Sequence, residues 1–302
     1  MASRSLAILV VVAGIGATAA AQPAPQKIRV GIYAPSVEFG TAQARLAYVQ
    51  GLAKAIEQNT GIKTEAQSYA SVAALKSDNV DYAIIDGPCY AVNLNWKLVA
   101  NASIGGAVSR TWALYSSAGD TMQALKGKKL AFIATGCNDA GFVDNAMLES
   151  EVDAQFFGAR NGEKDLTGAI AAVSSYKTAQ AVFAPVGAVK GLAKLFDTGN
   201  VPNPAFVEVA GKLPAAIGDK VSAAVVGYGG SGAISGWTKP TREPFLSLSG
   251  RLGRVVKTGI LANPEPVRLD AREVLVDPTT LKDAAFVAVR HHFVRPPGAR
   301  ME

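Results

Sequence analysis

The segment from residue 27 to residue 85 alternates between two hydrophobic patterns. In order, the patterns are those of a strand, a helix, a strand, a short helix and a buried strand, over residues 27–33, 42–59, 63–69, 71–78 and 82–85. Such alternation predicts an α/β fold, because consecutive parallel strands need crossover helices that cover the sheet. We therefore expect a largely parallel sheet flanked by helices.

A second unit of the same kind starts near residue 122. We predict a strand over 130–134, a helix over about 140–151, a strand over 155–157 and a helix over 186–196. The second unit therefore repeats the α/β organisation of the first.

The chain then returns to the first unit. A strand predicted over 206–209 leads back, and a last helix is predicted over 278–291. This order predicts two lobes, since the chain is long enough for two domains of ordinary size. Residues 27–114 together with 208–302 form lobe 1, and residues 115–207 form lobe 2.

Residues 1–21 have the pattern of a secretory signal peptide. Arg4 precedes an apolar run over residues 6–13, and the Ala19-x-Ala21 pattern is typical of a cleavage site. The run is shorter than a membrane span, and a retained N-terminal anchor is the alternative. We therefore predict a periplasmic protein cleaved near Ala21, with residues 22–26 as a linker.

Composition and charge limit the classes of function that the chain can have. The chain has 30 Lys and Arg residues against 24 Asp and Glu residues, but aromatic residues are not interleaved with basic clusters, so we expect no nucleic-acid partner. The two histidines are neighbours, His291 and His292, in the C-terminal tail. This scarcity disfavours Ser-His-Asp catalysis and zinc hydrolysis. We predict no catalytic residue, no metal and no cofactor.

Three segments carry a resemblance to a known family. Residues 125–132, Leu-Lys-Gly-Lys-Lys-Leu-Ala-Phe, resemble the segment that opens the second lobe of the phosphate/phosphonate-type periplasmic substrate-binding proteins of ABC transporters. Residues 80–90 and 30–35 are similar to two earlier segments of that family. In order and spacing, the resemblance covers residues 27–230.

The resemblance implies a type II-like, two-lobed periplasmic binding protein with its ligand in the cleft. Two crossover strands, near residues 112–117 and 205–209, would join the lobes, which would close by a hinge motion. Ligands of open α/β sheets bind beyond the carboxyl ends of the strands. Here those ends carry residues 35–40, 87–90 and 135–139. We expect a monomer that delivers its ligand to an inner-membrane permease.

One loop departs from the family's pattern. Phosphonate-binding members have Ser-Thr-Ser-Gly-like residues that hold an oxyanion, whereas this chain has Thr135-Gly136-Cys137-Asn138-Asp139. A carboxylate at Asp139 would occupy the helix terminus and repel an oxyanion, and Glu38 would add negative charge if it faced inward. The alternative is that Asp139 is only a helix cap and that Glu38 points to solvent.

The altered loop changes the ligand that we predict. A neutral or largely apolar ligand with one polar head, lipid-like or sterol-like, suits such a pocket, and the family has sterol-binding relatives. A cationic ligand would also suit the two carboxylates, and ordinary phosphonate or phosphate binding is the alternative.

The residues predicted to line the cleft come from both lobes. They are Tyr33, Glu38, Phe39, Tyr90, Asn138, Asp139 and Tyr176. We expect Tyr90 to donate a hydrogen bond to a polar head. Asn138 and Asp139 are expected to cap the helix of lobe 2 and to accept from a hydroxyl or an amine.

Cys89 and Cys137 are the only cysteines, and both fall in loops predicted to face the cleft from different lobes. In an oxidising compartment two cysteines often pair, and a disulfide here would clamp the cleft. We favour two buried, unpaired thiols, because a fixed clamp would block opening.

Three functions are compatible with these features. The first is a non-catalytic binding protein for transport, which we favour. A ligand-sensing partner of a membrane receptor shares the same binding physics. A secreted enzyme with Cys89 or Cys137 as nucleophile would need a general base, and neither cleft-forming region contains a histidine. We therefore predict that the chain is not an enzyme.

Overall fold

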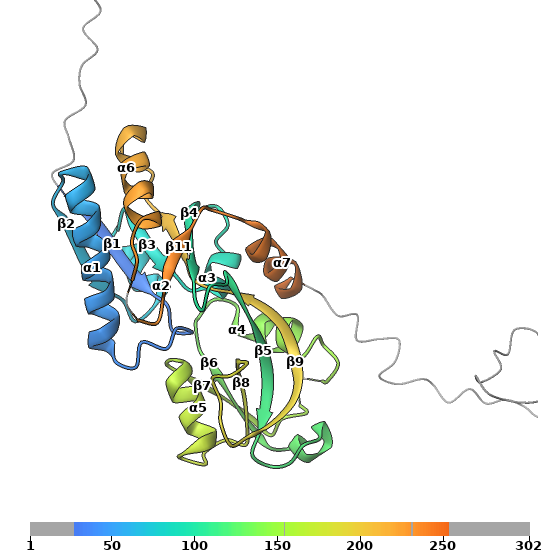
Figure 1. Ribbon diagram of the computed structural model, residues 1–302. Helices are drawn as coiled ribbons and strands as arrows, with labels where there is room; N and C mark the ends of the chain where they lie inside the picture. Colours follow the sequence, from blue (N-terminus) through green and yellow to red (C-terminus); the bar gives the residue numbers. More distant parts are fainter. Residues whose placement is uncertain (1–26, 154, 231, 254–302) are drawn as a thin grey trace, which may run out of the picture. The chain divides into compact units, whose positions relative to one another are not determined.

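The structure, a computed structural model, describes residues 27–153, 155–230 and 232–253 (Figure 1). All of these residues belong to one compact unit. The predicted signal peptide (1–21), the linker (22–26), the helix over 278–291 and the His291-His292 pair lie outside the described residues.

The first sheet contains six strands. They are β1 (Ile28–Tyr33), β2 (Thr64–Ser68), β3 (Tyr82–Ile85), β4 (Lys97–Ser103), β10 (Ala205–Glu208) and β11 (Gly236–Thr238). Their order across the sheet is β11-β4-β10-β3-β1-β2. β1 pairs parallel with β2 and β3, as the alternating pattern predicted, whereas β10 and β11 run antiparallel to their neighbours.

Helices cover both faces of the first sheet. α1 (Ala42–Thr60) and α6 (Ala215–Val226) pack on one face. The two short helices, α2 (Val72–Ser77) and α3 (Gly87–Ala91), pack on the other face. α1 begins where the Thr41 hydroxyl accepts a hydrogen bond from the amide of Ala44 (3.0 Å). It ends at Gly61, whose φ of 73° is left-handed.

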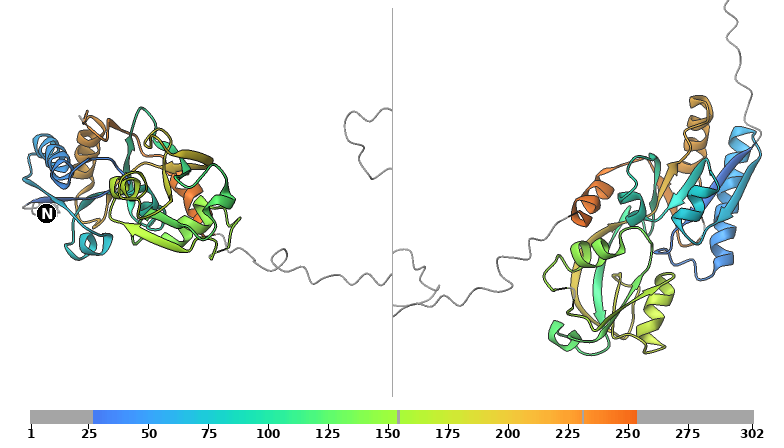
Figure 2. Two further views of the ribbon diagram at one scale, coloured as in Figure 1. Left: turned by 90° about the horizontal axis from the view of Figure 1, so that it is seen from below. Right: turned by 180° about the vertical axis from the view of Figure 1, so that it is seen from behind.

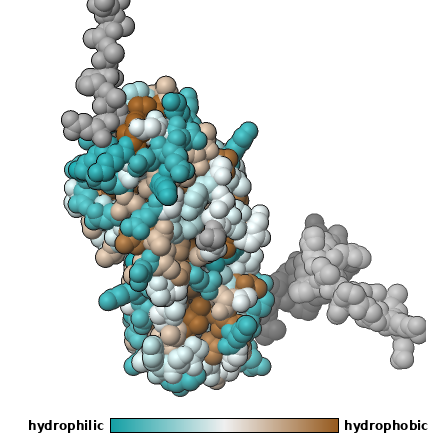
Figure 3. Space-filling model, turned by 60° about the vertical axis from the view of Figure 1, so that its left-hand side comes forward, coloured by the Kyte–Doolittle hydropathy of each residue, from teal (hydrophilic) through white to brown (hydrophobic). Residues whose placement is uncertain are grey.

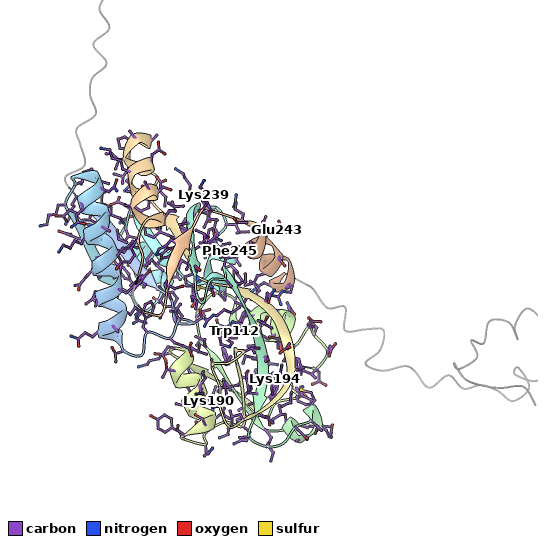
Figure 4. All side chains as sticks on the ribbon, in the orientation of Figure 1. Trp112, Lys190, Lys194, Lys239, Glu243 and Phe245 are labelled. Atoms are coloured by element: carbon purple, nitrogen blue, oxygen red, sulfur yellow. A yellow bond between two sulfur atoms is a disulfide. The ribbon has the colours of Figure 1, made fainter. Side chains whose placement is uncertain are left out.

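The second sheet contains five strands that follow one another in the sequence. They are β5 (Ser109–Ser116), β6 (Lys129–Ile133), β7 (Ala159–Glu163), β8 (Ala181–Pro185) and β9 (Ala193–Pro202), in the order β7-β6-β8-β5-β9. β6 pairs parallel with β7 and β8, and β5 pairs antiparallel with β8 and β9. Trp112 of β5, labelled in Figure 4, packs edge-on against Phe142 with ring centroids 5.9 Å apart.

Short helical segments and one regular helix, α5, accompany the second sheet. They are η1 (Met122–Leu125), α4 (Asp139–Gly141), the π-helical segment η2 (Phe142–Met147) and α5 (Leu166–Ser174). α5 packs against β6, β7 and β8. The mixed α/β class with two helix-flanked sheets is therefore confirmed, while the predicted lobe boundaries (27–114 with 208–302, and 115–207) stay a prediction.

Three local predictions in the second sheet are wrong. Residues 186–196 form no helix, because Gly187 and Gly191 adopt positive φ (90° and 73°) and β9 then pairs with β5. Residues 155–157 form no strand, and the strand that follows β6 is β7, which begins at Ala159. The helix predicted over 140–151 ends early, since Glu149 and Ser150 have positive φ.

One helix near the end of the described residues, α7 (Glu243–Leu252), packs into a core beside the first sheet and into the core of the second sheet (Figures 1 and 2). Phe245 is fully buried in a core beside the first sheet, edge-on to Tyr90 at 4.7 Å (Figure 4). Leu248 and Leu252 are buried in the core of the second sheet. α7 therefore ties the two sheets together by apolar packing.

Candidate ligand-binding site

Loops at the carboxyl ends of strands in both sheets meet in one region. We call this region the junction and define it as residues 33–45, 86–89, 110, 135–139 and 165–167. The Tyr33 hydroxyl at the end of β1 donates to the carbonyl of Thr135 after β6 (2.9 Å). The amide of Leu166 at the start of α5 donates to the carbonyl of Pro35 (3.0 Å). Two hydrogen bonds therefore connect the strand ends of one sheet to the other.

Tyr33 is held at the junction as a neutral hydrogen-bond donor. Burial raises the pKa of its phenol to about 12, and the negative charges of Asp86 and Asp139 add to this effect. The phenol therefore keeps its proton through the physiological pH range.

Asp86, which directly follows β3, is a fully buried carboxylate. It accepts hydrogen bonds from the amide and the hydroxyl of Ser36, both at 2.7 Å. Burial raises the pKa of Asp86, although these bonds and the nearby Arg110 oppose the rise. Arg110 of β5 donates to the Ser36 carbonyl (3.0 Å) and lies 3.7 Å from the carboxylate of Glu38. Asp86 and Arg110 thus fix the loop after β1 from two sides.

The buried Asp86 predicts a specific pH dependence. Because its pKa is higher in the folded than in the unfolded protein, its contribution to stability is complete below the unfolded value, about 3.9, and is lost as pH rises through the folded value. Asp86→Asn removes this titration. Urea unfolding from about pH 4 to pH 8 should show wild type losing unfolding free energy relative to Asp86→Asn as pH rises. A pH-independent difference between the two proteins would contradict the assignment.

The carboxylate of Asp139 fills a cradle of hydrogen-bond donors in its own loop. One oxygen accepts from the amide and the hydroxyl of Thr135 (3.0 and 2.6 Å), and the other accepts from the amide of Gly136 (3.0 Å). Asn138, in a left-handed conformation with φ of 62°, caps α4 by accepting from the amide of Gly141 (3.2 Å). Successive free amides in such a loop are a common anion site. In this chain an internal carboxylate already occupies them.

A small pocket of about 80 Å³ lies at the edge of the junction. Its lining includes Val37, Phe39, Thr41, Arg45, Asp165 and Thr167, so the loop after β1 and the start of α5 both contribute. Phe39 is half-buried and packs against Tyr48, with ring centroids 5.6 Å apart. Apolar, cationic and anionic groups therefore face the same small space.

The structure gathers five of the seven predicted site residues at the junction and places two elsewhere. Tyr90 is fully buried in the core beside α7, and its hydroxyl donates to the carbonyl of Trp96 (3.3 Å). Tyr176 is 73% exposed and follows the C-terminal end of α5, whereas Leu166 at the N-terminal end makes the junction contact. Ligand binding by these two tyrosines stays a prediction without support from their position.

Sequence reasoning missed several junction residues. Asp86 follows a buried strand, so the rule that sites lie at strand ends could have identified it. Arg110 gave no such signal, because it lies within β5 and reaches the loop after β1 only through the tertiary fold.

The structure overturns the preference for two free thiols. Cys89 of α3 and Cys137 of the loop after β6 form a disulfide, with Cα atoms 5.0 Å apart. The physical reason is that α3 begins directly after β3, so the strand ends that meet at the junction carry the two cysteines with them. Neither sulfur is a nucleophile in this state, which removes the basis of the Cys-dependent enzyme.

No helix in residues 27–253, with 154 and 231 set aside, has the length and hydrophobicity of a membrane span. In the same part of the chain, no three His, Cys, Asp or Glu side chains are arranged to hold a metal ion.

No protein-family profile matches the chain, and no curated protein sequence matches it. Solved structures do match. PhnD1 from Prochlorococcus marinus in complex with methylphosphonate superposes with a TM-score of 0.58 at 12% identity, over 76% of this chain and 97% of that chain. A binding protein component of an ABC phosphonate transporter from Pseudomonas aeruginosa gives 0.57 at 15%, over 74% and 84%.

A third structure, XAC2383 from Xanthomonas citri bound to ATP, gives a TM-score of 0.56 at 12% identity, over 76% of this chain and 97% of that chain. Similarity at these identities establishes the fold. The chain therefore has the two-sheet α/β fold of the periplasmic binding proteins.

Proposed function

We propose that the chain is a solute-binding protein that holds a small molecule at the junction of its two sheets. The observation that carries this proposal is the pocket whose lining comes from the loop after β1 and from the start of α5. This is where sites in open α/β folds form, beyond the carboxyl ends of the strands. The structurally similar proteins, which are binding components of transporters or bind small ligands, support the same assignment.

The charges at the junction favour a neutral or cationic ligand over an oxyanion. Asp139 occupies the amides of Thr135 and Gly136, so these amides are not available to a phosphonate. Even when Asp86 is not counted, the carboxylates at Glu38, Asp139 and Asp165 outnumber the guanidinium groups of Arg45 and Arg110. The negative charge of an oxyanion in this region would therefore be repelled.

The size of the pocket limits what it holds in this arrangement. About 80 Å³ is less than the roughly 300–1,000 Å³ of typical ligand sites, so the pocket holds a polar head and little more. A lipid-like or sterol-like body requires the two sheets to separate along Val37 and Phe39. On the face drawn in Figure 3, hydrophobic residues form small separate patches among hydrophilic ones, so this face offers no broad apolar surface for such a body.

In this proposal the protein works in the periplasm, delivers its ligand to an inner-membrane permease and catalyses no reaction. Native mass spectrometry tests the ligand class. The purified protein is measured alone, after incubation with a host lipid extract, and with inorganic phosphate and methylphosphonate. A retained lipid-sized or cationic adduct supports the proposal. Saturable phosphonate binding without any other adduct contradicts the ligand class, and no adduct in any condition contradicts the binding function.

Asp139 provides a sharper prediction about anions. Asp139→Ala frees the amides of Thr135 and Gly136 and removes a negative charge. We expect affinity for inorganic phosphate or methylphosphonate to rise at least about tenfold, which equals ~1.4 kcal/mol. Isothermal titration calorimetry measures the change.

The matched control for this prediction is Asp165→Ala. It removes one negative charge from the junction, as Asp139→Ala does, but from the lining of the pocket, and it frees only the amide of Gly168 at the start of α5. Equal gains in both variants would show that net charge, and not the vacated cradle, excludes the anion. No gain in Asp139→Ala would remove Asp139 as the residue that sets ligand class.

A further inference from the structure

A covalent bond crosses the junction. Cys89 lies in α3, at the carboxyl end of the first sheet's β3, and Cys137 lies in the loop after β6 of the second sheet. The two residues are 48 positions apart in the sequence, and β4, β5 and β6 lie between them. The disulfide is therefore a connection between the sheets that is separate from the main chain.

The disulfide lies among contacts that opening would have to break. The hydrogen bonds from Tyr33 to Thr135 and from Leu166 to Pro35 span the same region. These bonds can dissociate and re-form during a hinge motion, whereas a disulfide keeps its two Cα atoms within roughly 4.4–6.8 Å. While it is intact, the loops that carry Cys89 and Cys137 cannot separate.

We propose that the Cys89–Cys137 disulfide is a redox-controlled latch, and that a dithiol partner acts on it to open the junction. The dithiol attacks one sulfur, the Cys89–Cys137 bond breaks, and a mixed disulfide forms. The second thiol of the partner then displaces that cysteine, so the partner leaves as a disulfide and both cysteines become thiols. Both cysteines are buried, and Cys137, 5% exposed against 0% for Cys89, is the less buried of the two.

The consequence for ligand exchange rests on the proposed function. A binding protein with this latch closed exchanges ligand slowly, and reduction lets the loops around the pocket separate. The movement of the latch itself does not depend on any ligand, so it can be tested without one.

Hydrogen exchange measured by mass spectrometry provides the test. Three states of the full chain are compared: oxidised wild type, wild type reduced with excess dithiothreitol, and the double variant Cys89→Ser with Cys137→Ser. The reporter is the amide of Leu166, which donates across the junction. The control is the set of β8 amides, which pair within the second sheet. Alkylation and intact mass confirm the state of the cysteines.

We expect the Leu166 amide to exchange at least about tenfold faster in both states without the disulfide, with β8 unchanged. Equal protection of Leu166 in all three states would show that the disulfide does not hold the junction closed. A parallel increase in β8 would show that it stabilises the fold as a whole and is not a latch. These outcomes involve no ligand, so they are independent of the mass-spectrometric test of the proposed function.

Discussion

Replacing Phe245 with alanine is expected to lower the free energy of unfolding by about 3–5 kcal/mol. The ring is fully buried and lies edge-on to Tyr90, where truncation leaves a cavity between α7 and the first sheet. α7 would then lose its buried contact with the first sheet, and the packing of its two leucines, Leu248 and Leu252, in the core of the second sheet would be weakened. Chemical denaturation measured by circular dichroism gives the change directly.

The adjacent residue supplies the control. Leu246 is on the same helix but 47% exposed, so Leu246→Ala should cost much less than Phe245→Ala. Similar losses in the two variants would show that α7 contributes through its helical propensity and not through the buried ring.

Gly87→Ala is expected to have the second large effect, a loss of about 3 kcal/mol or more. A Cβ atom at Gly87 would lie 1.9 Å from the carbonyl oxygen of Pro202, which is backbone and cannot rotate away. The clash falls where α3 of the first sheet meets the end of β9. Either the two segments move apart or the fold is destabilised, and thermal unfolding together with hydrogen exchange distinguishes these results.

Gly250→Ala is the matched control, because the position has room for a Cβ atom. Gly250 lies in α7, and a Cβ atom added there would meet no other atom within 4 Å, so alanine should stabilise the helix by up to about 1 kcal/mol. A loss at Gly250 as large as that at Gly87 would refute the steric explanation.

Much of the fold was predictable because its strongest signals are local. Thr41 and Gly61 mark the two ends of α1, and the apolar run of β3 identifies a buried strand. The helix predicted over 186–196 failed because its residues form a loop and the start of β9, which pairs with β5 from much earlier in the chain. Pairing between distant segments leaves no periodic signal that a local window can detect.

The candidate site was predictable to the extent that it depends on strand ends. That rule placed Tyr33 and Asp139 at the junction. The rule could not identify Arg110, which lies within a strand. It also did not predict that the Tyr90 side chain is buried in a core that includes Phe245. The cysteine pair was recognised, but its bonding depended on how closely the two sheets approach, which the sequence does not encode locally.

The strand order has a consequence for synthesis on the ribosome. All five strands of the second sheet lie between residues 109 and 202, so this sheet has every partner as soon as that segment is available. β4 pairs only with β10 and β11, which are translated more than a hundred residues later. Domains generally fold as units during synthesis. We therefore expect the segment that forms the second sheet to fold first. β4 remains unpaired until β10 has been translated and pairs between β4 and β3.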